Sequence, residues 1–153
     1  MRIRTYIPED FAALYAIEEL CFEPRFRFSR SYMKRLLGAA NAAAWIAEDD
    51  WRVAGFAIVE WGEDADLRIA YIQTLEVAPA FRRRGFGVAL LKRCEESARM
   101  AGAVQLWLHV AEGNTEAIRL YESESFSRVS SEEHYYAPER HAYLYRKVLS
   151  DLG

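Results

Sequence analysis

Residues 82–87, Arg-Arg-Arg-Gly-Phe-Gly, combine three arginines with two glycines, residue types that suit the binding of phosphate groups. Glycine lets the backbone approach a ligand closely and takes conformations that a Cβ forbids. The run lies between an apolar segment, residues 71–77, and a segment with helical periodicity, residues 88–101. A helix that begins after such a turn offers unpaired N–H groups and a positive dipole end to an anion. The pattern predicts a phosphate cradle, although such a turn also occurs as a solvated turn.

Two other phosphate motifs are absent. The sequence holds no Gly-x-x-x-x-Gly-Lys-Ser/Thr, and no Gly-x-Gly-x-x-Gly opens a helix after the first strand. These absences argue against a nucleoside-triphosphate P-loop and a dinucleotide fold. A ligand with a pyrophosphate but no obligatory metal fits this cradle, and coenzyme A is such a ligand.

Length, composition and charge narrow the class of protein. The chain has 153 residues, of which 52% are hydrophobic and 28% charged, which suits a single domain over residues 1–153. Its net charge of −3 argues against a general nucleic-acid binder, so we interpret the arginines at 25, 27 and 30 as a solvated loop. No long apolar run and no signal-peptide core is present. We expect a cytoplasmic protein without a membrane partner, as a monomer or weak dimer.

Cysteines and histidines give no metal or disulfide pattern. Cys21 and Cys94 fall inside helical segments, and we expect both to be reduced core thiols. The three histidines are scattered without metal-ligand spacing. The sequence predicts no metal site.

The cradle must be positioned by neighbouring elements. The patterns predict strands over residues 2–7, 44–48, 52–61, 67–77, 104–110, 126–136 and 141–149. They predict helices over residues 8–21, 30–37 with Ser29 as N-cap, 88–101, and 115–123 with Asn114 as N-cap. The order is β-α-α-β-β-β-α-β-α-β-β, a mixed α/β layer whose central crossover runs through the cradle helix.

Three segments carry a family resemblance: YIQTLEVAPAFRRRGFG at 71–87, LHVAEGNTEAIRLYE at 108–122, and HYY at 134–136. In order and spacing the chain resembles the GCN5-related N-acetyltransferase (GNAT) superfamily, which transfers acetyl from acetyl-CoA to an amine. Within it, the chain resembles protein N-terminal acetyltransferases, both the bacterial ribosomal-protein-alanine type and the archaeal and eukaryotic catalytic subunits. The resemblance implies a mixed, mostly antiparallel sheet of six to seven strands flanked by about four helices.

The resemblance also assigns residues to acetyl-CoA. The strand before the cradle would offer backbone groups to the pantetheine arm, helped by a bulge and a splayed neighbouring strand, and a helix N-cap would contact the same arm. Backbone amides of the cradle would hold the phosphates. The implied binding residues are Leu75, Val77, Arg82, Arg83, Arg84, Gly85, Phe86, Gly87, Val88, Asn114 and Tyr121.

Catalytic roles follow from the same comparison. Tyr121 matches the family tyrosine near the CoA sulfur, and a phenol with a pKa of about 10 can protonate a departing thiolate. His109 and Tyr71 match a pair that holds a water, which accepts a proton from the incoming amine. The alternatives are a sheet histidine and packing tyrosines. Glu76 is a further candidate base, but strand alternation indicates an exposed glutamate.

We expect the acceptor to be the α-amine of a protein or peptide N-terminus, which attacks the acetyl group directly. The family's entrance residues match Tyr135 and Tyr136, with Phe22, Pro24 and Tyr32 as an opposite wall and Gln73 facing the second substrate position. A lysine or small-molecule amine as acceptor, and a non-catalytic acyl-CoA-binding protein, stay open as alternatives. The chain departs from the family at Ser125, where relatives carry glycine in a left-handed turn after a helix.

Overall fold

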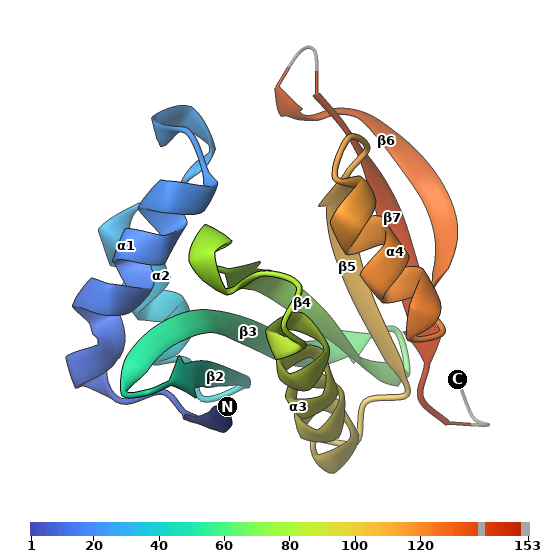
Figure 1. The fold of residues 1–153 in the computed structure, drawn as a ribbon. Helices are drawn as coiled ribbons and strands as arrows, with labels where there is room; N and C mark the ends of the chain where they lie inside the picture. Colours follow the sequence, from blue (N-terminus) through green and yellow to red (C-terminus); the bar gives the residue numbers. More distant parts are fainter. Residues whose placement is uncertain (138–139, 151–153) are drawn as a thin grey trace.

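A computed structural model describes residues 1–137 and 140–150, and the side chains of 132–140 fall outside that description (Figure 1). In chain order the elements are β1 (Arg2–Thr5), η1 (Pro8–Asp10), α1 (Phe11–Cys21), η2 (Pro24–Phe26), α2 (Arg30–Leu37), β2 (Ala42–Asp49), β3 (Arg52–Asp64), β4 (Leu67–Val77), η3 (Pro79–Phe81), α3 (Phe86–Met100), β5 (Gln105–Ala111), α4 (Thr115–Ser123), β6 (Ser127–Ala137) and β7 (Arg140–Val148). The predicted order of strands and helices is confirmed. In this part of the chain, no helix has the length and apolar character needed to span a bilayer.

The strands form one sheet in the order β1-β2-β3-β4-β5-β7-β6. Every pairing is antiparallel except that of β4 with β5, which the crossover through α3 makes parallel. This parallel pairing is short and joins Ile69–Tyr71 to residues 105–107. Beyond them the two strands diverge, so the sheet opens into two halves (Figure 1). The splay that the resemblance implied is present.

Strand β4 carries a bulge on its other edge. Ile58 of β3 pairs with Thr74, whereas the next residue, Val59, pairs with Ile72. Gln73 is therefore the extra residue of the bulge, and it interrupts the inside-outside alternation of the strand. The bulge implied by the resemblance is thus also present, directly beside the splay.

The cradle helix anchors the sheet. Its apolar stripe at Phe86, Leu90, Cys94 and Ala98 is buried as the helical spacing predicted. Helix α3 packs against β2, β3 and β4, while α1 packs against β3 and β4. Complete burial raises the pKa of the Cys94 thiol to about 12, and both cysteines are free thiols. Helix α3 therefore begins at a fixed place beside the end of β4.

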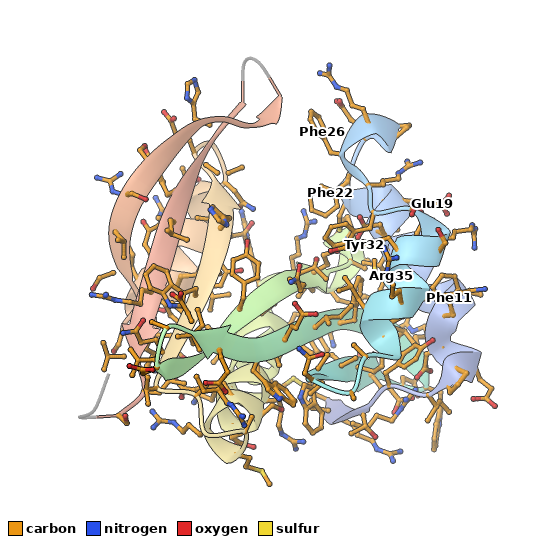
Figure 2. The ribbon with its side chains drawn as sticks, turned by 180° about the vertical axis from the view of Figure 1, so that it is seen from behind. Phe11, Glu19, Phe22, Phe26, Tyr32 and Arg35 are labelled. Carbon is orange, nitrogen blue, oxygen red and sulfur yellow. The ribbon has the colours of Figure 1, made fainter. Side chains whose placement is uncertain are left out.

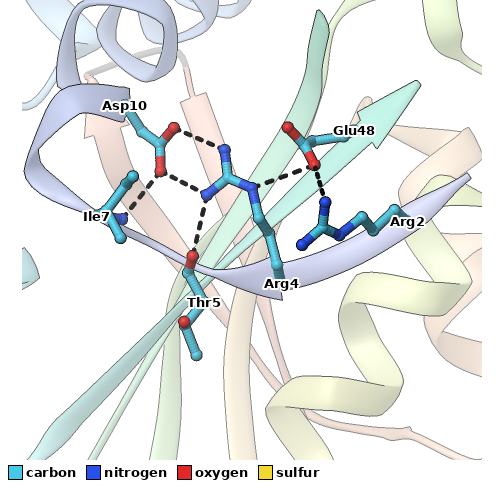
Figure 3. A network of polar contacts seen from close by, with 6 residues as sticks. All are labelled: Arg2, Arg4, Thr5, Ile7, Asp10 and Glu48. Carbon is cyan, nitrogen blue, oxygen red and sulfur yellow. Dashed lines mark hydrogen bonds and ion pairs between the residues drawn. The ribbon is translucent and has the colours of Figure 1, made fainter. Parts of the chain in front are cut away.

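A polar network ties the first strand to the first helix (Figure 3). The guanidinium of Arg4 donates to both carboxylate oxygens of Asp10 at 2.8 Å, and Asp10 also accepts the backbone N–H of Ile7 at 2.9 Å. Glu48 of β2 forms an ion pair with the Nε of Arg4 at 3.2 Å. These hydrogen bonds, first of all that from Arg4, hold the pKa of the Asp10 carboxyl below its usual range. The network fixes where α1 starts.

Candidate active site

The cradle has the geometry of an anion site. Gly85 is the N-cap of α3 with a φ of +88°, in the left-handed region that glycine adopts without strain, and no side chain caps the helix there. Ala89 is the residue whose N–H first bonds back, to the Gly85 carbonyl at 3.2 Å. The preceding N–H groups of the first turn have no helical acceptor. These free N–H groups form the positive end of the α3 dipole, where a phosphate group can accept hydrogen bonds from them.

The cradle also lies close to α4. A Cβ added at Gly87 would lie 3.2 Å from Cδ2 of Leu120, tighter than an ordinary contact. Glycine at position 87 thus lets the first turn of α3 lie close against Leu120 of α4. Phe86 packs edge-on against Phe81 and turns its ring into the core. The residues present therefore fit a pyrophosphate held by backbone amides.

The three arginines take three different positions. Arg82 donates from Nε to the Val77 carbonyl at 3.0 Å, which ties the cradle to the end of β4. Arg83 is exposed, with a φ of +63°, and lies 3.4 Å from Glu116. Arg84 forms an ion pair with Asp49 at 2.9 Å and lines neither of the two cavities described below. Of the three arginines, Arg82 and Arg83 line the cavity beside the cradle.

A cavity of about 330 Å³ runs from the cradle along the end of β4 to α4. Its lining includes the predicted donor residues Leu75, Val77, Arg82, Arg83, Gly85, Phe86, Gly87, Val88 and Asn114. Asn114 is also the N-cap of α4, and its side chain accepts the N–H of Ala117 at 3.2 Å. The structural and the ligand-binding interpretations of Asn114 are therefore compatible.

A second cavity, of about 520 Å³, fills the space where β4 and β5 diverge. It shares Phe22, Leu75, Asn114 and Ala117 with the first cavity. A group carried along the first cavity would reach the second beside Leu75. The fold thus supplies two adjoining compartments, one next to the phosphate cradle and one inside the splay.

Tyr71 and His109 face each other across the splay. The Tyr71 hydroxyl lies 2.5 Å from Nδ1 of His109, and the two ring centroids are 5.6 Å apart. Tyr71 belongs to the last parallel register pair, with Trp107, and His109 follows two residues further along β5. As alternation predicted, Leu106, Leu108 and Val110 are buried on the opposite face of that strand. The splay therefore brings a phenol and an imidazole into one cavity.

Tyr121 lines the same cavity from α4. It is 6% exposed and packs edge-on against Phe126 at 5.8 Å between ring centroids. The predicted catalytic set, Tyr71, His109 and Tyr121, therefore gathers around one cavity.

A wall of aromatic side chains bounds one side of the larger cavity. Phe22, Phe26, Phe28 and Tyr32, on or next to α1, η2 and α2, line the larger cavity. Figure 2 shows Phe22 and Phe26 pointing from these helical segments toward the opposite half of the sheet. Phe26 and Phe28 were missed in the sequence, although aromatic residues recur through 22–32. Pro24 begins η2, is exposed and does not line the cavity.

Two other predicted substrate residues can be placed only in part. Gln73, at the bulge, lines the larger cavity and donates from its amide to Glu60 at 3.2 Å. Tyr135 and Tyr136 belong to β6, but their side chains lie outside the described part of the structure. Among the described residues, no group of three His, Cys, Asp or Glu side chains gathers as a metal site.

The expectation that Glu76 is exposed was wrong. Its side chain is buried, with 4% of the residue exposed, and it accepts the hydroxyl proton of Thr74 at 2.5 Å. The bulge at Gln73 shifts the alternation, and α1 covers this end of β4 with Glu18. Burial, reinforced by Glu18, raises the pKa of the Glu76 carboxyl well above its usual range.

Comparison with curated proteins finds acetyltransferases among the relatives of the chain. The chain is 38% identical over 87 residues to the [ribosomal protein bS18]-alanine N-acetyltransferase of Salmonella typhimurium, covering 57% of this chain and 56% of that enzyme. It is 31% identical over 113 residues to an N-alpha-acetyltransferase of Sulfurisphaera tokodaii, covering 68% of each chain. The chain thus spans little more than half the length of the Salmonella relative.

Solved structures extend the likeness over the whole fold. The ribosomal-protein-S18-alanine N-acetyltransferase of Escherichia coli superposes with a TM-score of 0.84 at 25% identity, covering 99% of this chain and 96% of that one. The model of the acetyltransferase (GNAT) family matches residues 11–126, which include the cradle, the splayed strands and Tyr121. The family predicted from the three sequence segments is confirmed: the chain belongs to the acetyltransferase (GNAT) family.

Proposed function

We propose that this chain transfers acetyl from acetyl-CoA to the α-amine of a protein or peptide N-terminus. The observation that carries the proposal is the Tyr71–His109 hydrogen bond inside the larger cavity, which adjoins the compartment next to the phosphate cradle. The names of the relatives support the same acceptor class.

The donor side would be held mostly by backbone. The first-turn amides of α3, with Gly85 and Gly87, bind the phosphates, and Arg83 adds positive charge at the surface. Leu75 and Val77 line the path from there into the splay. When bound, acetyl-CoA supplies an acetyl group activated as a thioester. The remaining steps are proton movements on this chain's own residues.

An amine must lose a proton before it attacks the acetyl carbon. We assign the removal of that proton to His109, oriented by the Tyr71 hydroxyl and acting through a water held by the two side chains. As the new C–N bond forms and the C–S bond breaks, the sulfur leaves as a thiolate. Tyr121, which lines the same cavity, then donates its phenolic proton to that sulfur and regains a proton from the nitrogen that becomes the amide.

The choice of an α-amine rests on the cost of deprotonation. An α-amino group has a pKa of about 8 and a lysine side chain one of about 10.4. At about 1.4 kcal/mol per unit, presenting a neutral lysine costs about 3 kcal/mol more. An imidazole that works near neutral pH suits the easier deprotonation.

A panel of peptides tests the proposal. CoA release is measured with peptides that vary in their first two residues, each with a free α-amine or with a blocked α-amine and an internal lysine. We expect turnover only with free α-amines. Equal turnover of the blocked, lysine-containing peptides would show that the acceptor is a side-chain amine.

A further inference from the structure

Two glutamates meet in the wall that separates the two cavities. Glu18, on α1, lines the larger cavity, and Glu76, on β4, lines the smaller one. Their exposed fractions are 1% and 4%, so bulk water hydrates neither carboxyl. Two ionised carboxylates in such a place would repel each other strongly, because burial also removes the screening by water.

Hydrogen bonds use one oxygen of each carboxyl. The Oε2 atom of Glu18 accepts the backbone N–H of Phe28 at 2.9 Å, and the Oε2 atom of Glu76 accepts the hydroxyl of Thr74. The Oε1 atom of each is buried with no N–H or O–H donor among the described residues. After burial, Glu18 is the main cause that raises the pKa of the Glu76 carboxyl, as expected of two carboxyls that lie close together where α1 packs on β4. Since an ionised carboxylate only accepts, a bond between two carboxyls requires a proton on one of them.

The remaining groups around the pair do not replace that proton. Cys21 lies one helical turn after Glu18, and burial, with the Glu76 charge, raises the pKa of its thiol. Arg82 is a cation near Glu76, but it donates hydrogen bonds to the Val77 carbonyl and to Cys21 Sγ. On the β3 side, the register places the uncharged Phe56 opposite Glu76.

We propose that Glu18 and Glu76 hold one proton between them and act as a positioning pair that fixes the aromatic acceptor wall to strand β4. The inference rests on the proposed function, because it assigns the wall to the acceptor. Glu18 is joined to the wall by the hydrogen bond from the Phe28 N–H. Glu76 is part of β4, and the hydrogen bond from Thr74 holds its side chain in place on that strand. The shared proton is the link between these two attachments.

The pair has a consequence for pH. The shared proton is retained at neutral pH, and at alkaline pH both carboxyls ionise and repel. The wall then separates from β4, which raises the KM for the acceptor while kcat at saturating acceptor changes little. Of the pair, only Glu76 lines the donor cavity, whose phosphate end is built by the cradle and α4, so the KM for acetyl-CoA should change much less than that for the acceptor.

Two substitutions separate the link from the charge. In Glu76→Gln the amide donates to Glu18 and still accepts from Thr74, so the link stays without a titrating proton. We expect a near-normal acceptor KM at neutral pH and loss of its alkaline rise. Glu18→Ala removes the link, and we expect an acceptor KM raised about tenfold at all pH values. Glu19→Gln, next along α1 and exposed, is the matched control (Figure 2).

A spectroscopic measurement tests the proton without requiring activity. In ¹³C NMR spectra of glutamate-labelled protein, assigned with the two variants, one of the two side-chain carboxyl signals should stay protonated between about pH 5 and pH 8. If both signals titrate near the ordinary glutamate pKa, the pair does not share a proton and the inference fails. That result would leave the acetyl transfer untouched, and an inactive protein with a retained proton would overturn only the proposed function.

Discussion

At the scale of single residues, chemistry depends on a phenol and an imidazole that approach across the splay. Because Tyr71 and His109 share a hydrogen bond of 2.5 Å, removal of either side chain should disturb the proposed proton transfer from the amine. We expect His109→Gln to lower kcat/KM about a hundredfold. Tyr71→Phe should lower it less, since the imidazole remains. Glu76→Gln serves as the comparison: if it lowered kcat/KM a hundredfold while His109→Gln did not, the base would be misassigned.

Ser125 shows a residue under backbone strain. Its φ is +73°, and the turn it forms lets the Phe126 N–H bond to the Tyr121 carbonyl at 3.0 Å. The left-handed conformation costs a non-glycine residue about 1 kcal/mol or more. Ser125 therefore keeps the left-handed turn in which relatives carry glycine, and it bears this cost. We expect Ser125→Gly to stabilise the protein by up to about 1 kcal/mol, less the extra entropy of an unfolded glycine. Thermal denaturation measures this, and Ser127→Gly, in a strand, should destabilise instead.

At the scale of elements, local patterns predicted most of the fold. The Ser29 cap of α2, the buried stripe of α3 and the alternation of β5 all lie within a few residues of sequence, so the spacing alone indicated them. The bulge at Gln73 and the burial of Glu76 were not predictable in this way. Both depend on β3 and α1, elements distant in sequence that pack against β4 only in the folded chain.

The network around Asp10 gives an element-scale prediction for stability. Its lowered pKa means that the ionised carboxylate stabilises the fold above the unfolded pKa, and this contribution is lost as pH falls through the folded value. We expect Asp10→Asn to cost about 1–2 kcal/mol at neutral pH, because Arg4 loses one of its two charged partners and keeps only Glu48. The deficit in the melting temperature should shrink as pH falls. Asp66→Asn, in an exposed turn, should leave the melting temperature unchanged at every pH.

At the scale of the whole molecule, charge is distributed unevenly around the larger cavity, which we propose as the acceptor cavity. The chain carries a net charge of −3, yet two aromatic residues that line this cavity bear arginines on their rings. Arg25 lies 4.8 Å from the ring centre of Phe26, and Arg35 lies 5.2 Å from that of Tyr32. Figure 2 shows Tyr32 and Arg35 on adjacent turns of α2. The arginines interpreted from sequence as a solvated loop therefore include one that borders the acceptor cavity.

This placement predicts a charge preference for the acceptor beyond its first residue. A peptide that leaves the cavity past Phe26 and Tyr32 meets guanidinium groups, so acidic residues at its third and fourth positions should lower the acceptor KM several-fold relative to lysines. The difference should shrink as salt rises above about 0.1 M, where surface charges are screened within about 10 Å. Arg25→Gln with Arg35→Gln should abolish it, whereas Arg93→Gln, on α3 beside Trp45, should not. A KM that is independent of peptide charge at low salt would show that the peptide leaves the cavity along another path.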